Sequence, residues 1–253
     1  MATIAQAART AVIICLMAGA QSVAQAATEG GGFEMAHADN DVGNTASLQR
    51  GAKYFVNYCQ GCHSAEYVRY NRLGEDLELT DDELVNNIMF TGKQIFDTME
   101  NAMPAADSAR WFGNAPPDLS LIARSRGTDY VFNFLRAFYA EEGTPTGANN
   151  MVLANTSMPH VLWELQGIQQ AMFEEPENGL AEPVFVGFEM LTPGTLSSEE
   201  YDHVVRDIVN FLDYISEPMQ LERRSLGIKV IAFLLVFMLF AYLLKREIWR
   251  DVH

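Results

Sequence analysis

The chain of 253 residues has few cysteines and few basic side chains. It contains 3 cysteines, and Cys15 lies in an N-terminal stretch with the features of a leader. The body then keeps only Cys59 and Cys62, so no other thiol is available for a structural disulfide. Acidic residues outnumber basic residues by 33 to 17. This charge disfavours nucleic acid as a partner and suits a basic protein.

Long apolar runs are also scarce, and the first is short. A lone Arg9 precedes the apolar run 11–20, which ends before the small residues of segment 24–27. Ten apolar residues are too few to span a bilayer, and the pattern is typical of a cleavable secretory signal. We predict a signal peptide at 1–27, with a retained anchor as the alternative, and an exported body at 28–225.

The second apolar run is long enough to cross a membrane. Residues 226–244 are apolar except for Lys229, and a helix of that length spans about 28 Å. Basic residues flank both ends, so charge alone does not orient the helix. The predicted signal orients the helix, because it exports the body. A single span after the body then leaves the tail 245–253 in the cytoplasm.

The body contains the motif Cys59-Gln60-Gly61-Cys62-His63. Two thiols at this spacing followed by an imidazole are the attachment signature of haem c. A thioredoxin-like pair would come with a βαβ pattern, and a zinc site would need a second pair of ligands. Neither is visible in the sequence. We therefore predict one covalent haem c on Cys59 and Cys62, with His63 on the iron.

The ligand on the second face of the iron decides the class of function. An open position would allow gas binding or oxygen chemistry, whereas a second strong ligand leaves electron transfer. A thioether would raise the potential. Met103 and Met158 both precede a proline in irregular sequence, and the residues alone leave both open. The other candidates are Met151, Met190, His160 and His203.

Helical periodicity and capping signals predict a mainly α body. A helix from Ser47 leads into Cys59, and capping boxes start helices at Thr80 and Ser197. Asp118 or Ser120 is expected to cap a helix over 121–126, and Thr128 or Asp129 a helix reaching Phe138.

The remaining segments are predicted to be irregular. Paired prolines force an extended strip over 111–120, which can lie along a porphyrin edge. Segment 143–155 is predicted to be a loop, and a short hairpin is predicted around 183–189. The rest of segment 166–195 has no assigned role.

The leader, the CQGCH motif, the strip 115–120, Met158-Pro159 and one C-terminal span together resemble the cytochrome c1 family. The resemblance covers nearly all of the mature chain. It implies a cytochrome c-like haem domain with irregular loops and insertions, plus one transmembrane helix. It further implies His63 and Met158 as the iron ligands, Pro117 in the strip beside the haem, Arg124 near a propionate and Tyr130 beside it. For Arg124 the alternative is a surface salt bridge.

The resemblance also implies a role and partners. Members belong to ubiquinol-cytochrome c reductase with cytochrome b and a Rieske iron-sulfur protein, and transfer electrons from the Rieske protein to cytochrome c. The chain would then be no enzyme by itself, and would sit in the inner membrane of a bacterium with its haem domain in the periplasm. The alternatives are a haem subunit of a terminal oxidase, and a five-coordinate haem enzyme if Met158 is not a ligand.

Overall fold

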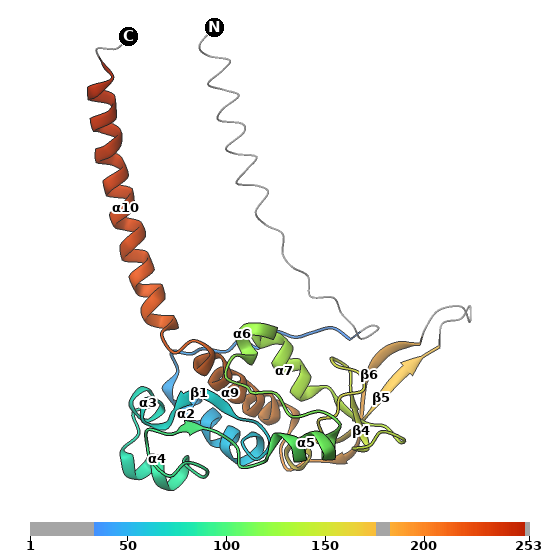
Figure 1. Ribbon diagram of the computed structural model, residues 1–253. Coiled ribbons are helices and arrows are strands. Elements are labelled where there is room, and N and C mark those ends of the chain that lie inside the picture. Colours follow the sequence, from blue (N-terminus) through green and yellow to red (C-terminus); the bar gives the residue numbers. More distant parts are fainter. Residues whose placement is uncertain (1–32, 176–182, 251–253) are drawn as a thin grey trace.

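A computed structural model describes residues 33–175 and 183–250 (Figure 1). The predicted signal peptide lies outside these residues. The helices of the domain are α2 (Thr45–Tyr54), the π-helical turn η1 (Phe55–Cys59), α3 (Tyr70–Asp76), α4 (Asp81–Asn87), α5 (Ala105–Phe112), α6 (Ile122–Arg126), α7 (Thr128–Arg136), α8 (Trp163–Gln166) and α9 (Ser198–Ser216). The strands form three antiparallel pairs: β1 (Ala65–Arg69) with β2 (Thr98–Met99), β3 (Phe138–Ala140) with β4 (Ala148–Asn150), and β5 (Gly167–Glu174) with β6 (Val184–Pro193). The mainly α fold is confirmed.

The core is built around the crossing of α2 and α9. Gly51 on α2 approaches α9 so closely that a Cβ there would lie 2.1 Å from the backbone oxygen of Asp207. Ser47 and Arg50 on the same helix donate to the Asp207 carboxylate at 2.6 to 2.8 Å. Helix α2 continues directly into η1, whose last residue is Cys59, so this crossing fixes the position of Cys59.

Both predicted capping boxes are present. The side chains of Thr80 and Ser197 each accept from a backbone N–H of the first helical turn, and Glu83 and Glu200 accept from the capping residues in return. The latter box starts α9, the longest helix of the domain, whose apolar side carries much of the core. These two starts follow from local sequence alone.

The other two predicted helix caps are wrong. Helix α6 has no side-chain cap, because Asp118 and Ser120 instead accept from the backbone of Glu66 and Tyr67. Helix α7 starts after Gly127, and Asp129 accepts from the backbone N–H of Ala38 at 2.8 Å. In each case a distant segment binds the side chain that a local cap would have used.

Two boundaries also differ from the prediction. Helix α7 ends at Arg136, and Phe138 begins β3, which pairs with β4 inside the predicted loop 143–155. The segment around 183–189 is not a hairpin by itself. It belongs to the single strand β6, whose partner is β5, so the hairpin is longer than expected and starts at Gly167.

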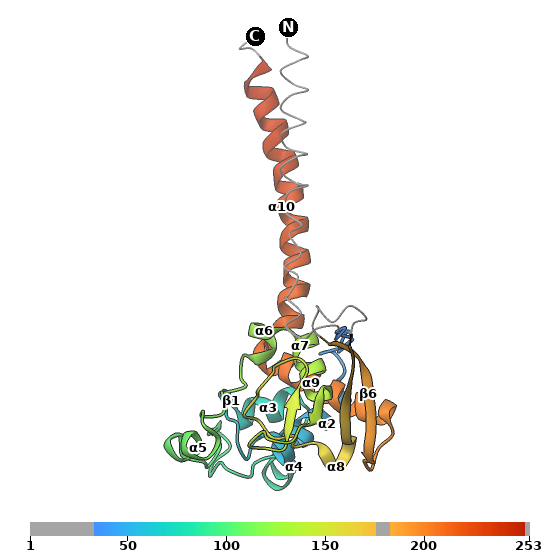
Figure 2. The ribbon, with the colours of Figure 1, turned by 90° about the vertical axis from the view of Figure 1, so that its right-hand side faces the viewer.

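Helix α10 (Gln220–Ile248) extends away from the domain and is longer than the predicted span on both sides. Its 29 residues correspond to about 43 Å, and no residue of its apolar stretch is buried. Figures 1 and 2 show it leaving the domain on the side where α6 lies, with α4 at the opposite end. Length, composition and exposure support a membrane anchor.

Candidate haem site

The side of the site that carries His63 is fixed by the proline strip. The imidazole Nδ1 lies 2.7 Å from the carbonyl oxygen of Pro117. A carbonyl only accepts, so Nδ1 carries the proton and Nε2 keeps its lone pair. Burial lowers the pKa of His63, which holds the ring neutral, although the Pro117 contact opposes this shift. A neutral ring with a fixed tautomer is the form that binds iron.

The strip itself is held against the chain that follows the motif. Leu119 donates its backbone N–H to the Ser64 oxygen at 2.8 Å, and Asp118 accepts from Glu66 at 2.8 Å. The predicted extended strip is therefore present, and its carbonyl orients the imidazole. Its prolines matter here because they prevent a helix that would use this carbonyl internally.

The two cysteines lie at the end of η1 and in the turn that follows it. Cys59 is buried and Cys62 is partly exposed, and both thiols are free. Burial, with a smaller contribution from Cys62, raises the pKa of the Cys59 thiol to about 12. These residues fit a covalently held porphyrin, because one turn carries both thiols and the imidazole. The Pro117 carbonyl already orients that imidazole.

The sulfur candidates for the other face of the iron lie in different places. Met158 is half-buried and packs against the main core, which contains Cys59. Met151 is buried in a separate small cluster with Ala137 and Ala171. Met190 is exposed on β6, and Met103 belongs to neither cluster. Of the four sulfurs, only Met158 shares the core with an attachment cysteine.

The imidazole candidates are placed less favourably. His160 stacks on Phe138 with ring centroids 5.1 Å apart, and burial lowers its pKa to about 4. His203 is exposed on α9, with Arg206 3.5 Å from its Nδ1. Neither contact involves the turn that carries His63.

The structure gives Arg124 and Tyr130 different partners. The Arg124 side chain is 62% exposed and forms an ion pair with Glu217 at 3.1 Å. Tyr130 packs against the main core, and Arg126 lies over its ring with the guanidinium carbon 5.4 Å from the centroid. The sequence reasoning did not single out Arg126, although it lies only two positions from Arg124.

Two further residues next to the motif were missed. Asn101 donates its side-chain amide to the carbonyl oxygen of Cys62 at 2.5 Å and its backbone N–H to Ser64 at 3.0 Å. Gln60, inside the motif, is 2% exposed and makes buried hydrogen bonds. No sequence signal marks Asn101, whereas the position of Gln60 between the cysteines could have drawn attention to it.

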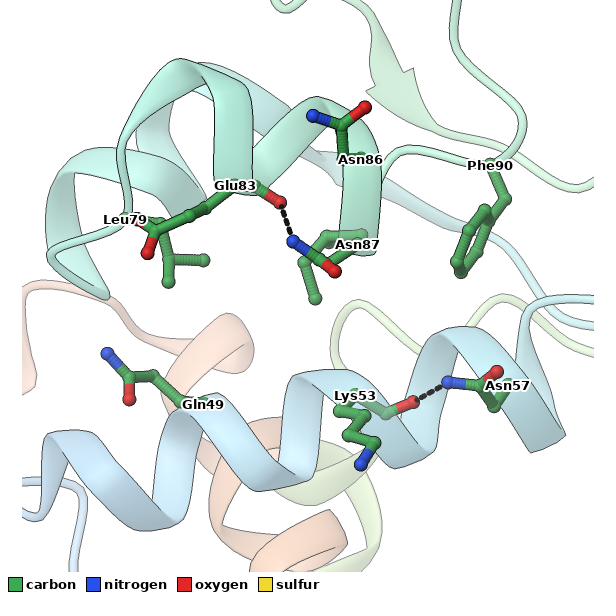
Figure 3. A pocket seen from close by; sticks show the side chains of 9 residues that line it. Gln49, Lys53, Asn57, Leu79, Glu83, Asn86, Asn87 and Phe90 are labelled. Carbon is green, nitrogen blue, oxygen red and sulfur yellow. Dashed lines mark hydrogen bonds between the residues drawn. The ribbon is translucent and has the colours of Figure 1, made fainter.

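A groove of roughly 460 Å³ with a mixed polar and apolar lining lies elsewhere, between α2 and α4 (Figure 3). Asn57 donates to the Lys53 carbonyl and Asn87 to the Glu83 carbonyl, so these amides are bound to their own helices. None of the predicted haem residues lines this groove. It is therefore no part of the candidate haem site.

The comparisons with known proteins agree with this geometry. Residues 40–252 match the model described as "Cytochrome C1 family". The chain belongs to the cytochrome c1 family. Cytochrome c1 of Allochromatium vinosum is 46% identical over 88% of this chain and 92% of its own length. The "ammonia monooxygenase gamma subunit" of Nitrosomonas europaea is 43% identical, over 84% and 86%. Cytochrome c1 of Rhodospirillum rubrum is 29% identical, over 81% of each chain.

Membership of the cytochrome c1 family confirms several predictions. The chain carries one covalently bound haem c with its iron, and it is the c-haem subunit of a bc1-type complex. It takes part in electron transport and is not a catalytic enzyme by itself. Its single apolar C-terminal helix is the membrane anchor expected of such a subunit.

Proposed function

We propose that this cytochrome c1 accepts an electron from the Rieske iron-sulfur protein and passes it to a cytochrome c. The haem supplies a reversible one-electron couple. The observation that carries the proposal is the 2.7 Å contact between His63 and the Pro117 carbonyl, with Met158 on the core that contains Cys59. Ligands on both faces leave no open position on the iron. This suits electron transfer rather than oxygen chemistry.

Each residue of the site has one task in this proposal. Cys59 and Cys62 hold the porphyrin covalently, and His63 binds the iron with a ring that Pro117 orients. Met158 would hold the iron through its thioether, a ligand that favours the ferrous state and a high potential. That potential suits a carrier late in a respiratory chain.

The propionates need a cationic or hydrogen-bonding neighbour. The resemblance predicts Arg124 near a propionate, but its guanidinium already forms an ion pair with Glu217. Arg126 and Tyr130 form a contact on the surface of the main core, beside Phe134, and thus offer a guanidinium and a hydroxyl together. We propose that Arg126 and Tyr130 lie beside the haem propionates, and that the main role of Arg124 is its ion pair with Glu217.

The proposal extends to the surroundings of the chain. Cytochrome b and the Rieske protein are its partners, and α10 crosses the bacterial inner membrane with the haem domain in the periplasm. The acidic balance of the chain suits a basic cytochrome c as acceptor, because opposite charges speed the encounter. The segment after α10 is then cytoplasmic.

Gentle solubilisation of the membrane tests this function. We expect the chain to co-purify with a dihaem cytochrome b and a Rieske protein, and its haem to show the pyridine haemochrome spectrum of a thioether-linked porphyrin. Co-purification with a terminal oxidase instead would overturn the assignment of partners. Rapid carbon monoxide binding by the native protein would overturn two-sided ligation and favour a five-coordinate haem enzyme.

A further inference from the structure

Gln60 places a polar amide in the buried part of the haem-attachment turn. It lies between Cys59 and Cys62 and is 2% exposed. The attachment chemistry uses the thiols and the imidazole and makes no demand on this position. Burying an amide is costly unless it is hydrogen-bonded, so its inward orientation calls for partners.

Two hydroxyl groups supply partners for the amide nitrogen, whereas the amide oxygen is buried without a hydrogen-bond partner in the described structure. The Gln60 amide donates to the Tyr70 hydroxyl at 2.7 Å and to the Thr91 hydroxyl at 3.1 Å. The two hydroxyls are themselves 3.1 Å apart, which closes a triangle. Tyr70 is the first residue of α3 and is fully buried, and Thr91 lies in the segment after α4.

Gly92 allows this triangle to close. A Cβ at that position would lie 2.8 Å from a ring carbon of Tyr70. The backbone after Thr91 therefore lies directly against the tyrosine ring, and a larger residue would push the Thr91 hydroxyl away. The close packing shows that the arrangement is specified by several residues.

We propose that Gln60, Tyr70 and Thr91 are positioning residues that hold the haem-attachment turn, and through it the His63 ring, in place. The turn is attached on its other sides by Asn101 to the Cys62 carbonyl and by Pro117 to His63. Without the triangle, the end of the turn nearest Cys59 would be held only by its own backbone bonds, such as Gln60 to Phe55. This inference rests on haem attachment at Cys59 and Cys62.

The test uses the full-length, haem-loaded protein in detergent. Gln60→Leu, Tyr70→Phe and Thr91→Val each remove part of the triangle, and Thr91→Ser keeps the hydroxyl. Tyr214→Phe is the matched control, because Tyr214 donates to Asp76 at 2.6 Å, away from the turn. The first measurement is hydrogen exchange at the backbone amides of Cys62 and His63, which both donate to the Cys59 carbonyl. The second is the electron paramagnetic resonance signal of the low-spin ferric haem, which reports the orientation of the iron's ligands.

We expect exchange at these two amides to rise roughly two- to tenfold in the three disrupting variants, the effect of losing one hydrogen bond. The ferric resonance should shift in the same variants, and Thr91→Ser should restore both. Tyr214→Phe should change neither, even if it lowers overall stability. Unchanged exchange and resonance in Tyr70→Phe and Thr91→Val, or equal changes in Tyr214→Phe, would overturn the proposal. If Gln60→Leu does not accumulate, the two Thr91 variants still decide. Failure of haem attachment in the wild type would instead be seen in the haemochrome spectrum.

Discussion

The two sides of the haem site are held by different means. On the His63 side, groups from several distant segments bind the five residues 59–63. These groups are the Pro117 carbonyl, the Asn101 amide and the hydroxyls of Tyr70 and Thr91. On the Met158 side, the backbone N–H of Met158 donates to the hydroxyl of Thr156, only two positions away. We predict that the His63 side chain is held more rigidly than the Met158 side chain. Rigidity comes from contacts between distant segments, and adaptability from a loop that packs mainly through a flexible thioether.

The loop before Met158 is organised by its own asparagines. Asn149 accepts from the backbone of Asn155 at 2.7 Å, and Asn150 accepts from Val152 at 2.8 Å. Asn155 adopts a positive φ of 59°, which asparagine tolerates better than most residues. These bonds within the loop add to the pairing of β4 with β3 and to the bond from the Asn150 amide to the Phe134 carbonyl, and Met158 packs against the main core.

The strongest way to disturb the fastened side is to separate α2 from α9. Gly51→Ala would place a methyl group 2.1 Å from the Asp207 backbone oxygen and 2.7 Å from the Phe211 Cβ. We expect a loss of about 3 kcal/mol of stability and a fall in Tm of roughly 6–12 °C. Thermal unfolding followed by circular dichroism measures this. Gly227→Ala on α10 is the control, since apart from the backbone of its own helix no atom lies within 4 Å of a Cβ there and the position is outside the haem domain; equal losses in both variants would contradict the crossing as the cause.

The predicted role of Met158 is tested by removing its sulfur. Met158→Leu should abolish the near-infrared methionine-to-iron band, allow carbon monoxide to bind, and lower the midpoint potential by an amount on the order of 100 mV. Absorption spectroscopy and a redox titration measure these changes. Met151→Leu is the matched control, because its sulfur is buried in the second cluster. If Met151→Leu gives the spectral change and Met158→Leu does not, the ligand assignment is wrong.

A smaller effect distinguishes the two arginines near the end of the proline strip. Oxidised haem carries one more positive charge than reduced haem, so removing a nearby cation favours oxidation. Arg126→Gln should lower the midpoint potential by roughly 30 mV, whereas Arg124→Gln should change it little. Paired redox titrations measure both. The reverse order would return the propionate role to Arg124.

The smallest effect concerns the N-terminal arm, which packs on α7 next to Tyr130. His37 lies 2.7 Å from Asp129, which raises the pKa of the imidazole above its ordinary 6.5. This contact contributes fully below pH 6.5 and is lost as the pH rises through the raised value. The protection of the Ala38 amide, which donates to Asp129, should therefore fall at higher pH. His37→Gln should remove that pH dependence, and His203→Gln should leave it.

Local signals in the sequence predicted the parts of the fold that depend on neighbours in the chain. Both capping boxes, the helix leading to Cys59 and the apolar anchor helix depend on residues within a few positions of one another. The caps of α6 and α7 could not be predicted, because Asp118 and Asp129 bind segments 52 and 91 positions away. Sequence alone does not show which distant backbone competes for a carboxylate.

The candidate site divides in the same way. The motif identified Cys59, Cys62 and His63, because attachment chemistry demands that spacing. The residues alone left Met103 and Met158 equal, and the resemblance to the family chose Met158. Packing against the core of Cys59 now supports that choice. Asn101 was missed because it lies 39 positions from Cys62 and reaches it only after the chain has folded. Arg126 was missed although it is close to Tyr130 in the sequence, because the resemblance pointed to Arg124.

The burial of Cys59 has a consequence for the order of maturation. Burial raises the pKa of the Cys59 thiol and covers its sulfur, so this thiol is a poor nucleophile at neutral pH once the domain has closed. Thioether formation with a vinyl group must then precede closure of the domain. We therefore expect the newly made polypeptide to stay open until its porphyrin is attached.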